Sequence, residues 1–330
     1  MSLDVIIVGA GLAGLSAGRI LRDAGKRVLL LDKGRSVGGR MATRRIGAGV
    51  ADHGAQFFTV REPEFQALVD QWLAGSVVFE WSRGWSDGSL AATRDGHPRY
   101  AATGGMNALT KHMAQGLDVR VNAPVRAVRK LADGWAVELV DGEIVRGSAV
   151  ILTAPVPQAL ALCEAGDLVL PEAQKRALTA IRYDPCLTAL YEVEGQVNLP
   201  SPGAIQRPHA NLSWLADNKR KGISSTQIIT VQASGPYSVK LWEASDADVL
   251  KAFRVDLMPF FDEDAQILST QVKRWKYSLV TSPHPERCLL VEEHDAQGSP
   301  MPLVFAGDAF GFPGVEGAVI SGMAAANALL

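Results

Sequence analysis

Residues 5–14 read Val-Ile-Ile-Val-Gly-Ala-Gly-Leu-Ala-Gly, an apolar run followed by three closely spaced glycines. Four β-branched residues in a row are typical of a strand buried in a parallel sheet. Of the three glycines, Gly9 suits a tight turn, Gly11 lets the backbone approach a pyrophosphate, and Gly14 allows a helix to pack closely on the strand. A helix that starts here presents its N-terminus to the phosphate charge.

The following residues complete a strand–helix–strand unit. Helical periodicity begins with Leu12 and Ala13 and runs to residue 24, and residues 28–31 form a second apolar run. Asp32 stands at the end of that run, where a carboxylate can accept both ribose hydroxyls of an adenosine. Glycines, flanking strands and acid together predict a dinucleotide site, although they do not separate NAD from FAD.

The rest of the chain predicts a second region inserted into the nucleotide-binding domain. Helices are expected at 61–73, 106–115 and 247–261, and strands within 79–92, 118–152, 186–194, 226–233 and 266–275. Residues 303–306 return as a parallel-type strand before a last helix, and residues 153–157 resemble a crossing between domains. We therefore expect an α/β fold with a Rossmann-type FAD-binding domain and a smaller antiparallel-sheet substrate domain. The predicted limits are 1–60, 101–156 and 290–330 for the first, and 61–100 and 157–289 for the second.

Composition excludes several classes of function. The net charge of -2 and the charged fraction of 21% offer no basic surface for nucleic acid or anionic lipid. The three cysteines lie far apart, which disfavours a metal site or a disulfide scaffold. No apolar run is long enough to span a membrane, and Asp4 without a preceding Lys or Arg disfavours a signal peptide. We expect a cytoplasmic protein without a nucleic-acid or membrane partner.

A second glycine motif follows Asp32 and Lys33. Gly39, Arg40 and Met41 resemble the Gly-Gly-Arg motif of the amine-oxidase-like FAD superfamily. Glycines let the loop pass close to the pyrophosphate, and Arg40 offers it a planar fork of donors.

The C-terminal end holds a third block that matches the same superfamily. There, the equivalents of Gly307 and Asp308 place a carboxylate on the ribityl hydroxyls, a role compatible with that of a helix N-cap. The helix that follows aims its N-terminus at the N1–C2 carbonyl edge of the flavin and stabilises reduced flavin. Its first residues here include Glu316, Gly317, Ala318 and Val319. Cys288 is too close to this block to hold the flavin, so the resemblance implies non-covalent FAD.

Residues 52–58, 274–277 and the C-terminal block together resemble the renalase family, particularly its bacterial members. The resemblance spans most of the chain but is thin over 157–265. It implies a fold similar to p-hydroxybenzoate hydroxylase and the amine oxidases. The implied reaction oxidises 1,2- or 1,6-dihydro isomers of NAD(P)H to NAD(P)+ and reduces O2 to H2O2.

By the same resemblance, Gln56 and Phe57 lie beside the isoalloxazine, and the backbone of Val125 reads the adenine. From the residues alone, Val125 is only an apolar strand residue that follows Pro124. Hydride transfer from a dihydropyridine leaves no substrate proton to remove, so no catalytic acid or base is required. We expect His53 to be structural.

Two alternatives remain open at this stage. Amine oxidases place an aromatic wall before their Glu-Gly-Ala sequence, where this chain has Gly314 and Val315. A flavin-free binding protein of the same fold would have no need of Arg40 and Asp308.

Two aromatic residues are candidates for the substrate pocket. Trp214 and Tyr237 lie in predicted strands and could face the flavin, although aromatic residues at such positions are more often core. Gly314 would leave room over the flavin for a pyridine ring. Residues 219–221 (Lys-Arg-Lys) are interpreted as a solvated turn.

Overall fold

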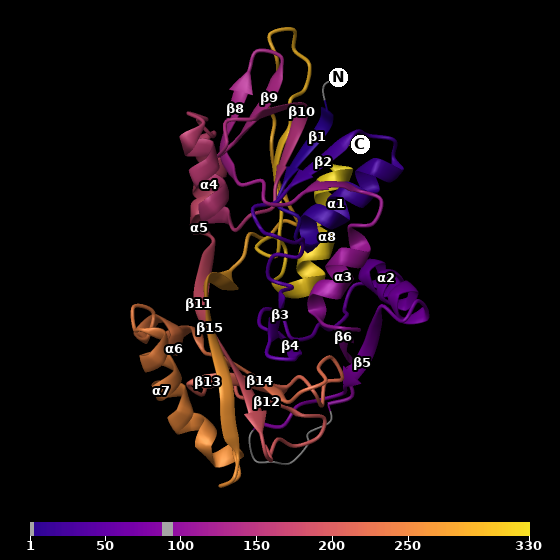
Figure 1. Cartoon of the computed structure of the whole chain (residues 1–330). Helices are drawn as coiled ribbons and strands as arrows, with labels where there is room; N and C mark the ends of the chain where they lie inside the picture. Colours follow the sequence, from indigo (N-terminus) through magenta and orange to yellow (C-terminus); the bar gives the residue numbers. More distant parts are fainter. Residues whose placement is uncertain (1–2, 88–94) are drawn as a thin grey trace.

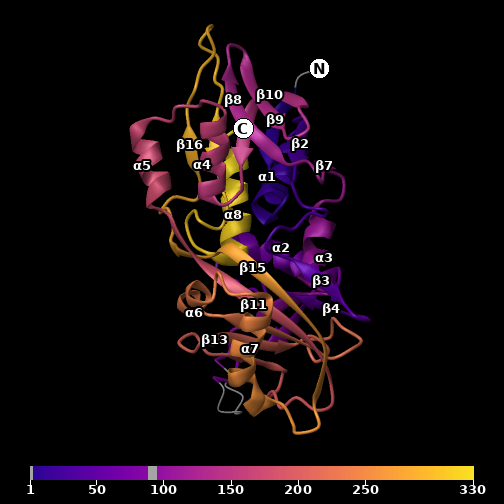
Figure 2. The same ribbon diagram turned by 60° about the vertical axis from the view of Figure 1, so that its left-hand side comes forward.

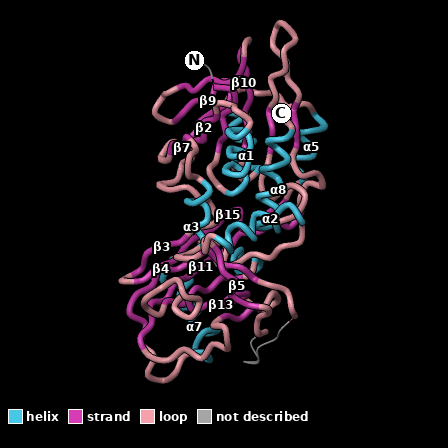
Figure 3. The backbone as a smooth tube through the Cα atoms, turned by 90° about the vertical axis from the view of Figure 1, so that its right-hand side faces the viewer, coloured by secondary structure: helices cyan, strands magenta, loops and turns pink. Residues whose placement is uncertain are grey.

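The computed structural model describes residues 3–87 and 95–330, which form two lobes (Figure 1). Both termini lie in the upper lobe, as Figures 1 and 3 show from two sides. Residues 88–92 of the predicted strand region 79–92 lie outside the described residues.

The upper lobe is built on a mixed sheet whose central strands are parallel. Its order is β16-β17-β10-β1-β2-β7, and the β8–β9 hairpin pairs antiparallel with β10. The strands are β1 (Leu3–Val8), β2 (Val28–Leu31), β7 (Asp118–Arg120), β8 (Val125–Leu131), β9 (Gly134–Leu139), β10 (Ile144–Leu152), β16 (Leu289–Val291) and β17 (Leu303–Phe305). β1 pairs with β2 and β10, and β10 pairs in turn with β17, so strands from both ends of the chain share one sheet.

Both faces of this sheet are covered, which explains why its first strand is apolar throughout. Val5 and Ile7 pack with α1 (Leu12–Asp23), α3 (Met106–Met113) and α8 (Gly314–Asn327). Ile6 and Val8 face the other way, toward the β8–β9 hairpin, α4 (Val156–Ala165) and α5 (Glu172–Ala180). Because successive side chains alternate across a strand, burial on both sides demands an uninterrupted apolar run.

The lower lobe contains an antiparallel sheet of order β12-β13-β14-β11-β15. Its strands are β12 (Ala204–Gln206), β13 (Leu212–Asp217), β14 (Ile228–Ala233), β11 (Arg182–Glu194) and β15 (Gln266–Ser282). One face packs on α6 (Gly235–Lys240), α7 (Asp246–Leu257) and the short helix η1 (Met258–Phe260) (Figure 2). The fold class predicted from the sequence is confirmed.

The remaining elements lie between the two sheets. They are β3 (Thr43–Ile46), β4 (Gly49–Asp52), α2 (Pro63–Ala74), β5 (Val78–Ser82) and β6 (Arg99–Ala102). The β3–β4 hairpin buries Ile46 and Ala51 against Leu190 and Ile228 of the lower sheet. The hairpin thereby places residues 53–58, which follow β4, at the junction of the lobes.

Two expectations from the sequence differ from the structure. The chain does not leave the upper lobe at residues 153–157, because α4 and α5 pack on the upper sheet and the long strand β11 makes the crossing (Figure 1). Tyr237 lies in helix α6 rather than in a strand, since Ser234 and Pro236 start a helix there. The domain limits themselves stay a prediction.

Candidate functional site

Two glycine loops face each other at the carboxyl end of β1. Within the described chain, Gly11 caps α1 without any side-chain hydrogen bond, and the first turn of α1 holds no acidic residue. The Gly38 N–H donates to the Ala10 carbonyl at 2.8 Å, and a Cβ on Gly39 would lie 3.9 Å from the Gly11 Cα. A Cβ on Gly11 would meet nothing within 4 Å. The unpaired N–H groups and the open space suit a phosphate.

Asp32 is held so that it retains acceptor capacity. One carboxylate oxygen accepts from the Ala10 N–H at 2.7 Å and the other from the Gly34 N–H at 2.6 Å. Each oxygen keeps a second lone pair for a ribose hydroxyl. The Ala123 N–H donates to the Asp32 carbonyl at 2.8 Å, two residues before Val125 at the start of β8. Lys33 turns away and donates to Gln158 at 3.0 Å.

Arg40 and Asp308 are brought together from opposite ends of the chain. The guanidinium makes a bidentate pair with the carboxylate, with N···O distances of 2.8 and 2.5 Å. Sequence reasoning predicted separate contacts, Arg40 with the pyrophosphate and Asp308 with the ribityl chain. The pair now ties the second glycine loop to the C-terminal block, while Met41 is buried in the core.

The N-terminus of α8 is another place where backbone donors are available. In the described chain Pro313 caps it without a side-chain hydrogen bond, and Gly314 has a φ of +100° with open space beside its Cα. Gly307 donates its N–H to the Ser321 hydroxyl at 2.8 Å, which anchors the loop before the helix. Gly317, Ala318 and Val319 follow within the first turns.

The two carboxylate oxygens of Glu316 have different surroundings. Its Oε1 accepts from the Arg61 and Glu62 N–H groups, each at 2.7 Å, and so caps the start of α2. Its Oε2 is buried with no hydrogen-bond partner among the described residues. The side chain thus joins α8 to α2 through Oε1.

Asp52, at the end of β4, is a buried hub that sequence reasoning missed. Its Oδ1 accepts from the Thr43 hydroxyl at 2.5 Å and from the Met106 N–H at 2.8 Å. Its Oδ2 accepts from the Lys221 ammonium at 2.6 Å, and both side chains are 0% exposed. The solvated turn predicted for residues 219–221 is therefore wrong for Lys221. A lysine within a polar run carries no periodic signal that would reveal its burial.

Gln56 and Phe57 follow directly after this hub. The Gln56 amide donates to the Asp52 and Gly54 carbonyls, at 2.8 and 3.1 Å, whereas its Oε1 is buried and unpartnered in the part of the chain that the structure describes. The Phe57 ring packs on Trp214, with ring centroids 5.2 Å apart. A buried amide oxygen without a donor is the feature expected beside a ligand that carries N–H groups.

The two aromatic residues predicted for the substrate pocket have different surroundings. Trp214 lies on the face of the lower sheet that is turned toward the upper lobe, in register with Gln232. Tyr237 instead stacks on Phe253 of α7 at 6.1 Å, on the helix-covered side of that sheet. Only Trp214 therefore approaches Phe57.

His53 is buried between the lobes and stacks on Trp275, with centroids 5.3 Å apart. Burial, followed by the charges of Arg44 and Lys273, lowers its pKa from 6.5 to about 4. The ring is therefore neutral at neutral pH. It carries no charge there, and its structural role stays a prediction.

The depressed pKa of His53 makes stability depend on pH. Between pH 6.5 and about 4 the unfolded chain binds a proton that the folded chain does not, so this contribution is complete above 6.5 and is lost as the pH falls toward 4. The contribution of His53 to the free energy of unfolding should decrease by about 3 kcal/mol over that range. Urea unfolding at several pH values should show a shallower decrease for His53→Gln. Parallel curves for the two proteins would contradict the assignment.

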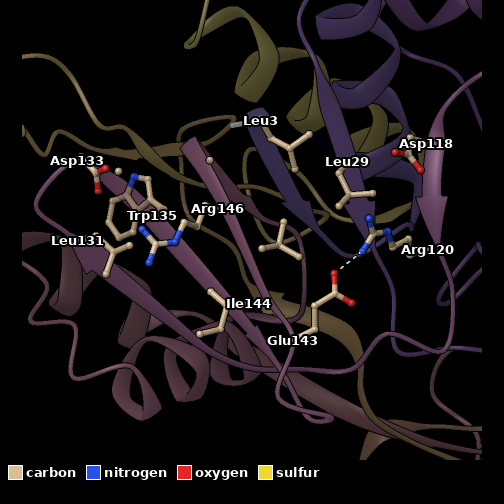
Figure 4. Close-up of a pocket in the computed structure, with 13 residues that line it drawn as sticks. Leu3, Leu29, Asp118, Arg120, Leu131, Asp133, Trp135, Glu143, Ile144 and Arg146 are labelled. Carbon is tan, nitrogen blue, oxygen red and sulfur yellow. Dashed lines mark hydrogen bonds and ion pairs between the residues drawn. The ribbon is translucent and has the colours of Figure 1, made fainter. Parts of the chain in front are cut away.

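Two pockets among the described residues lie elsewhere. One, of about 550 Å³, is at the amino ends of β1 and β10, where Arg120 and Glu143 pair at 2.7 Å (Figure 4). The other, of about 300 Å³, lies between Arg44 and Lys111. Neither is lined by the glycine loops, and ligands of such sheets bind at the carboxyl ends of the strands.

Comparisons with known proteins identify the family of the chain. A family model described as flavin containing amine oxidoreductase matches residues 73–330, and one described as NAD(P)-binding Rossmann-like domain matches residues 7–72. Renalase from Mus musculus is 29% identical over 308 residues, which cover 86% of this chain and 87% of the relative. Putrescine oxidase from Kocuria rosea is 40% identical over 68 residues, 21% of this chain and 14% of that protein.

The fold is also found among solved structures. Cyclohexylamine oxidase from Brevibacterium oxydans superposes with a TM-score of 0.75 at 14% identity, covering 100% of this chain and 99% of that chain. Across the described residues, no helix is both long and apolar enough to cross a membrane.

Proposed function

The chain belongs to the flavin-containing amine oxidoreductase family, and from this premise we propose that it oxidises 1,2- and 1,6-dihydro isomers of NAD(P)H to NAD(P)+. It is a renalase-like flavoprotein with FAD as its cofactor. In the proposed reaction, O2 takes up the two electrons and the proton of the transferred hydride, together with one proton from solvent, and becomes H2O2. The partners are thus a small dihydropyridine dinucleotide and O2.

The residues present fit FAD. The N–H groups at Gly11 and the open space beside them suit the pyrophosphate, and Asp32 retains lone pairs for the adenosine ribose. Gln56 offers an unpartnered buried oxygen to the isoalloxazine edge, and the backbone at the start of α8 offers donors. Bound flavin supplies a hydride acceptor. The chain's part is to bind and orient the rings and to stabilise negative charge at the α8 N-terminus.

The observation that carries the proposal is Gly314. An amine oxidase has an aromatic wall in this region, whereas a Cβ on Gly314 would meet nothing within 4 Å. A flat pyridine ring with its carboxamide needs such open space to stack on a flavin. No acid or base is required, because a dihydropyridine that gives up a hydride becomes an aromatic cation with no proton to lose.

Discrimination between isomers should come from geometry. Every dihydropyridine is a hydride donor, so the site must place C2 or C6, rather than C4, about 3–3.5 Å from the accepting nitrogen. Anaerobic stopped-flow measurements should show flavin bleaching at least about 100-fold faster with the 1,2- and 1,6-dihydro isomers than with 1,4-NAD(P)H. Putrescine and cyclohexylamine should also react poorly.

The outcomes separate the alternatives. Rapid bleaching by an amine, with none by the dihydro isomers, would identify the protein as an amine oxidase. A colourless protein that does not take up FAD would instead support a flavin-free binding function.

A further inference from the structure

Lys221 belongs to the lower lobe, but its ammonium is surrounded by residues that lead to the flavin site. It follows β13, and its side chain is completely buried. The ammonium donates to Asp52 Oδ2 and to the Gln56 carbonyl, each at 2.6 Å. It also lies 4.7 Å from the centroid of the Trp81 ring. Asp52 ends β4, Gln56 follows it and Trp81 lies in β5, so the ammonium joins the lower lobe to both ends of the stretch from residue 52 to residue 81.

Net stability is a poor explanation for this arrangement. Two charges removed from water lose hydration that their mutual attraction seldom exceeds, and an apolar pair of similar volume is often as stable. Desolvation accordingly lowers the pKa of Lys221, while the charge of Asp52 opposes that shift. What an apolar pair would lack is the bond to the Gln56 carbonyl, which fixes the peptide between Gln56 and Phe57.

Other polar groups of the lower lobe hold the same segment. Thr230 donates its hydroxyl to the Asp52 carbonyl at 2.8 Å, and Gln232 donates to the Gly54 carbonyl at 2.8 Å. On the opposite side, Asp52 Oδ1 is fixed by the Met106 N–H of α3. The segment is therefore clamped from both lobes, and Lys221 provides the charged contact nearest to Gln56.

We propose that Lys221 is a positioning residue that sets residues 52–57 against the bound flavin. Its bond to the Gln56 carbonyl holds the peptide between Gln56 and Phe57, and with it the unpartnered Gln56 Oε1 and the Phe57 ring. Lys221 itself does not touch the reacting atoms. The proposal rests on the placement of FAD in the proposed function but not on the identity of the substrate.

The test removes the contact between Lys221 and the Gln56 carbonyl without leaving an unpaired buried charge. Lys221→Met alone leaves a buried carboxylate without a counter-charge, so the decisive variant is Lys221→Met combined with Asp52→Asn. Lys219→Met is the matched control, because it removes an exposed lysine from the same turn. The readouts are the thermal midpoint of the apoprotein, the FAD dissociation constant and the visible absorbance spectrum of bound flavin.

We expect the double variant to keep a midpoint close to that of the wild type while its FAD dissociation constant rises about tenfold or more. Its flavin spectrum should also shift, and Lys219→Met should resemble the wild type in all three readouts. Wild-type FAD affinity and spectrum in the folded double variant would overturn the proposal. Because none of these readouts uses a substrate, the result does not depend on whether the protein oxidises dihydro-NAD(P).

If the double variant does not fold, Lys221→Arg decides. It retains the positive charge, but the wider guanidinium must move the Gln56 peptide. The positioning role requires weaker FAD binding and a shifted spectrum, whereas a purely electrostatic role requires wild-type values. The latter result would overturn the proposal.

Discussion

Alanine at Gly14 should destabilise the apoprotein, whereas alanine at Gly11 should leave it folded and weaken FAD binding. A Cβ on Gly14 would overlap the Gly9 carbonyl oxygen, which belongs to rigid backbone. The helix would have to move off β1, at a cost of about 1–3 kcal/mol or more. A Cβ on Gly11 meets no protein atom within 4 Å and would fill only the space assigned to the pyrophosphate.

Each variant is the control for the other, since both remove one glycine from the same loop. Urea unfolding without FAD should show a large loss for Gly14→Ala and a change within about 1 kcal/mol for Gly11→Ala. FAD titration should show about tenfold or greater weakening for Gly11→Ala, because hydrogen bonds to a charged phosphate are disturbed. Wild-type FAD affinity in Gly11→Ala would show that the pyrophosphate does not bind at this loop.

These glycines illustrate which features the sequence could predict. The apolar run of β1, the turn glycines and Asp32 lie within about thirty residues, the size of one strand–helix–strand unit. Their roles follow from backbone geometry and from burial on both faces of a parallel sheet. The strand β17 and the helix α8 at the C-terminal end could be predicted as well, because an apolar run and the glycines that follow it are equally local signals. The ligand contacts of Gly307 and Asp308 were inferred from the resemblance and stay a prediction.

The contacts between distant parts of the chain could not be predicted in this way. Arg40 and Asp308 are separated by 268 residues, and Asp52 and Lys221 by 169. The sequence predicted ligand contacts for Arg40 and Asp308 and a solvated turn for Lys221, and only the packed lobes show which of these charges meet. The helix at Tyr237 is different, because the Ser-Gly-Pro sequence before it was a local start signal that strand alternation obscured.

Replacing Asp52 by alanine should be among the most destabilising single substitutions in the chain. It would leave the Lys221 ammonium buried without a counter-charge, because both side chains are 0% exposed. It would also remove the acceptor for the Met106 N–H at the start of α3. Breaking one partner of a buried pair costs about 3–5 kcal/mol.

Glu143→Ala provides a control, because it breaks an ion pair with nearly the same N···O distance as that of Asp52 and Lys221 but at an exposed position. Glu143 pairs with Arg120 at 2.7 Å, against 2.6 Å for Asp52 and Lys221, but its side chain is 51% exposed. Exposed pairs contribute at most about 1 kcal/mol, since water and salt screen them. Urea unfolding of the two apoprotein variants should therefore differ several-fold in lost free energy, with added salt reducing only the Glu143 effect. Equal losses would mean that water reaches Asp52 in solution, and the junction between the lobes would then be more open than the structure shows.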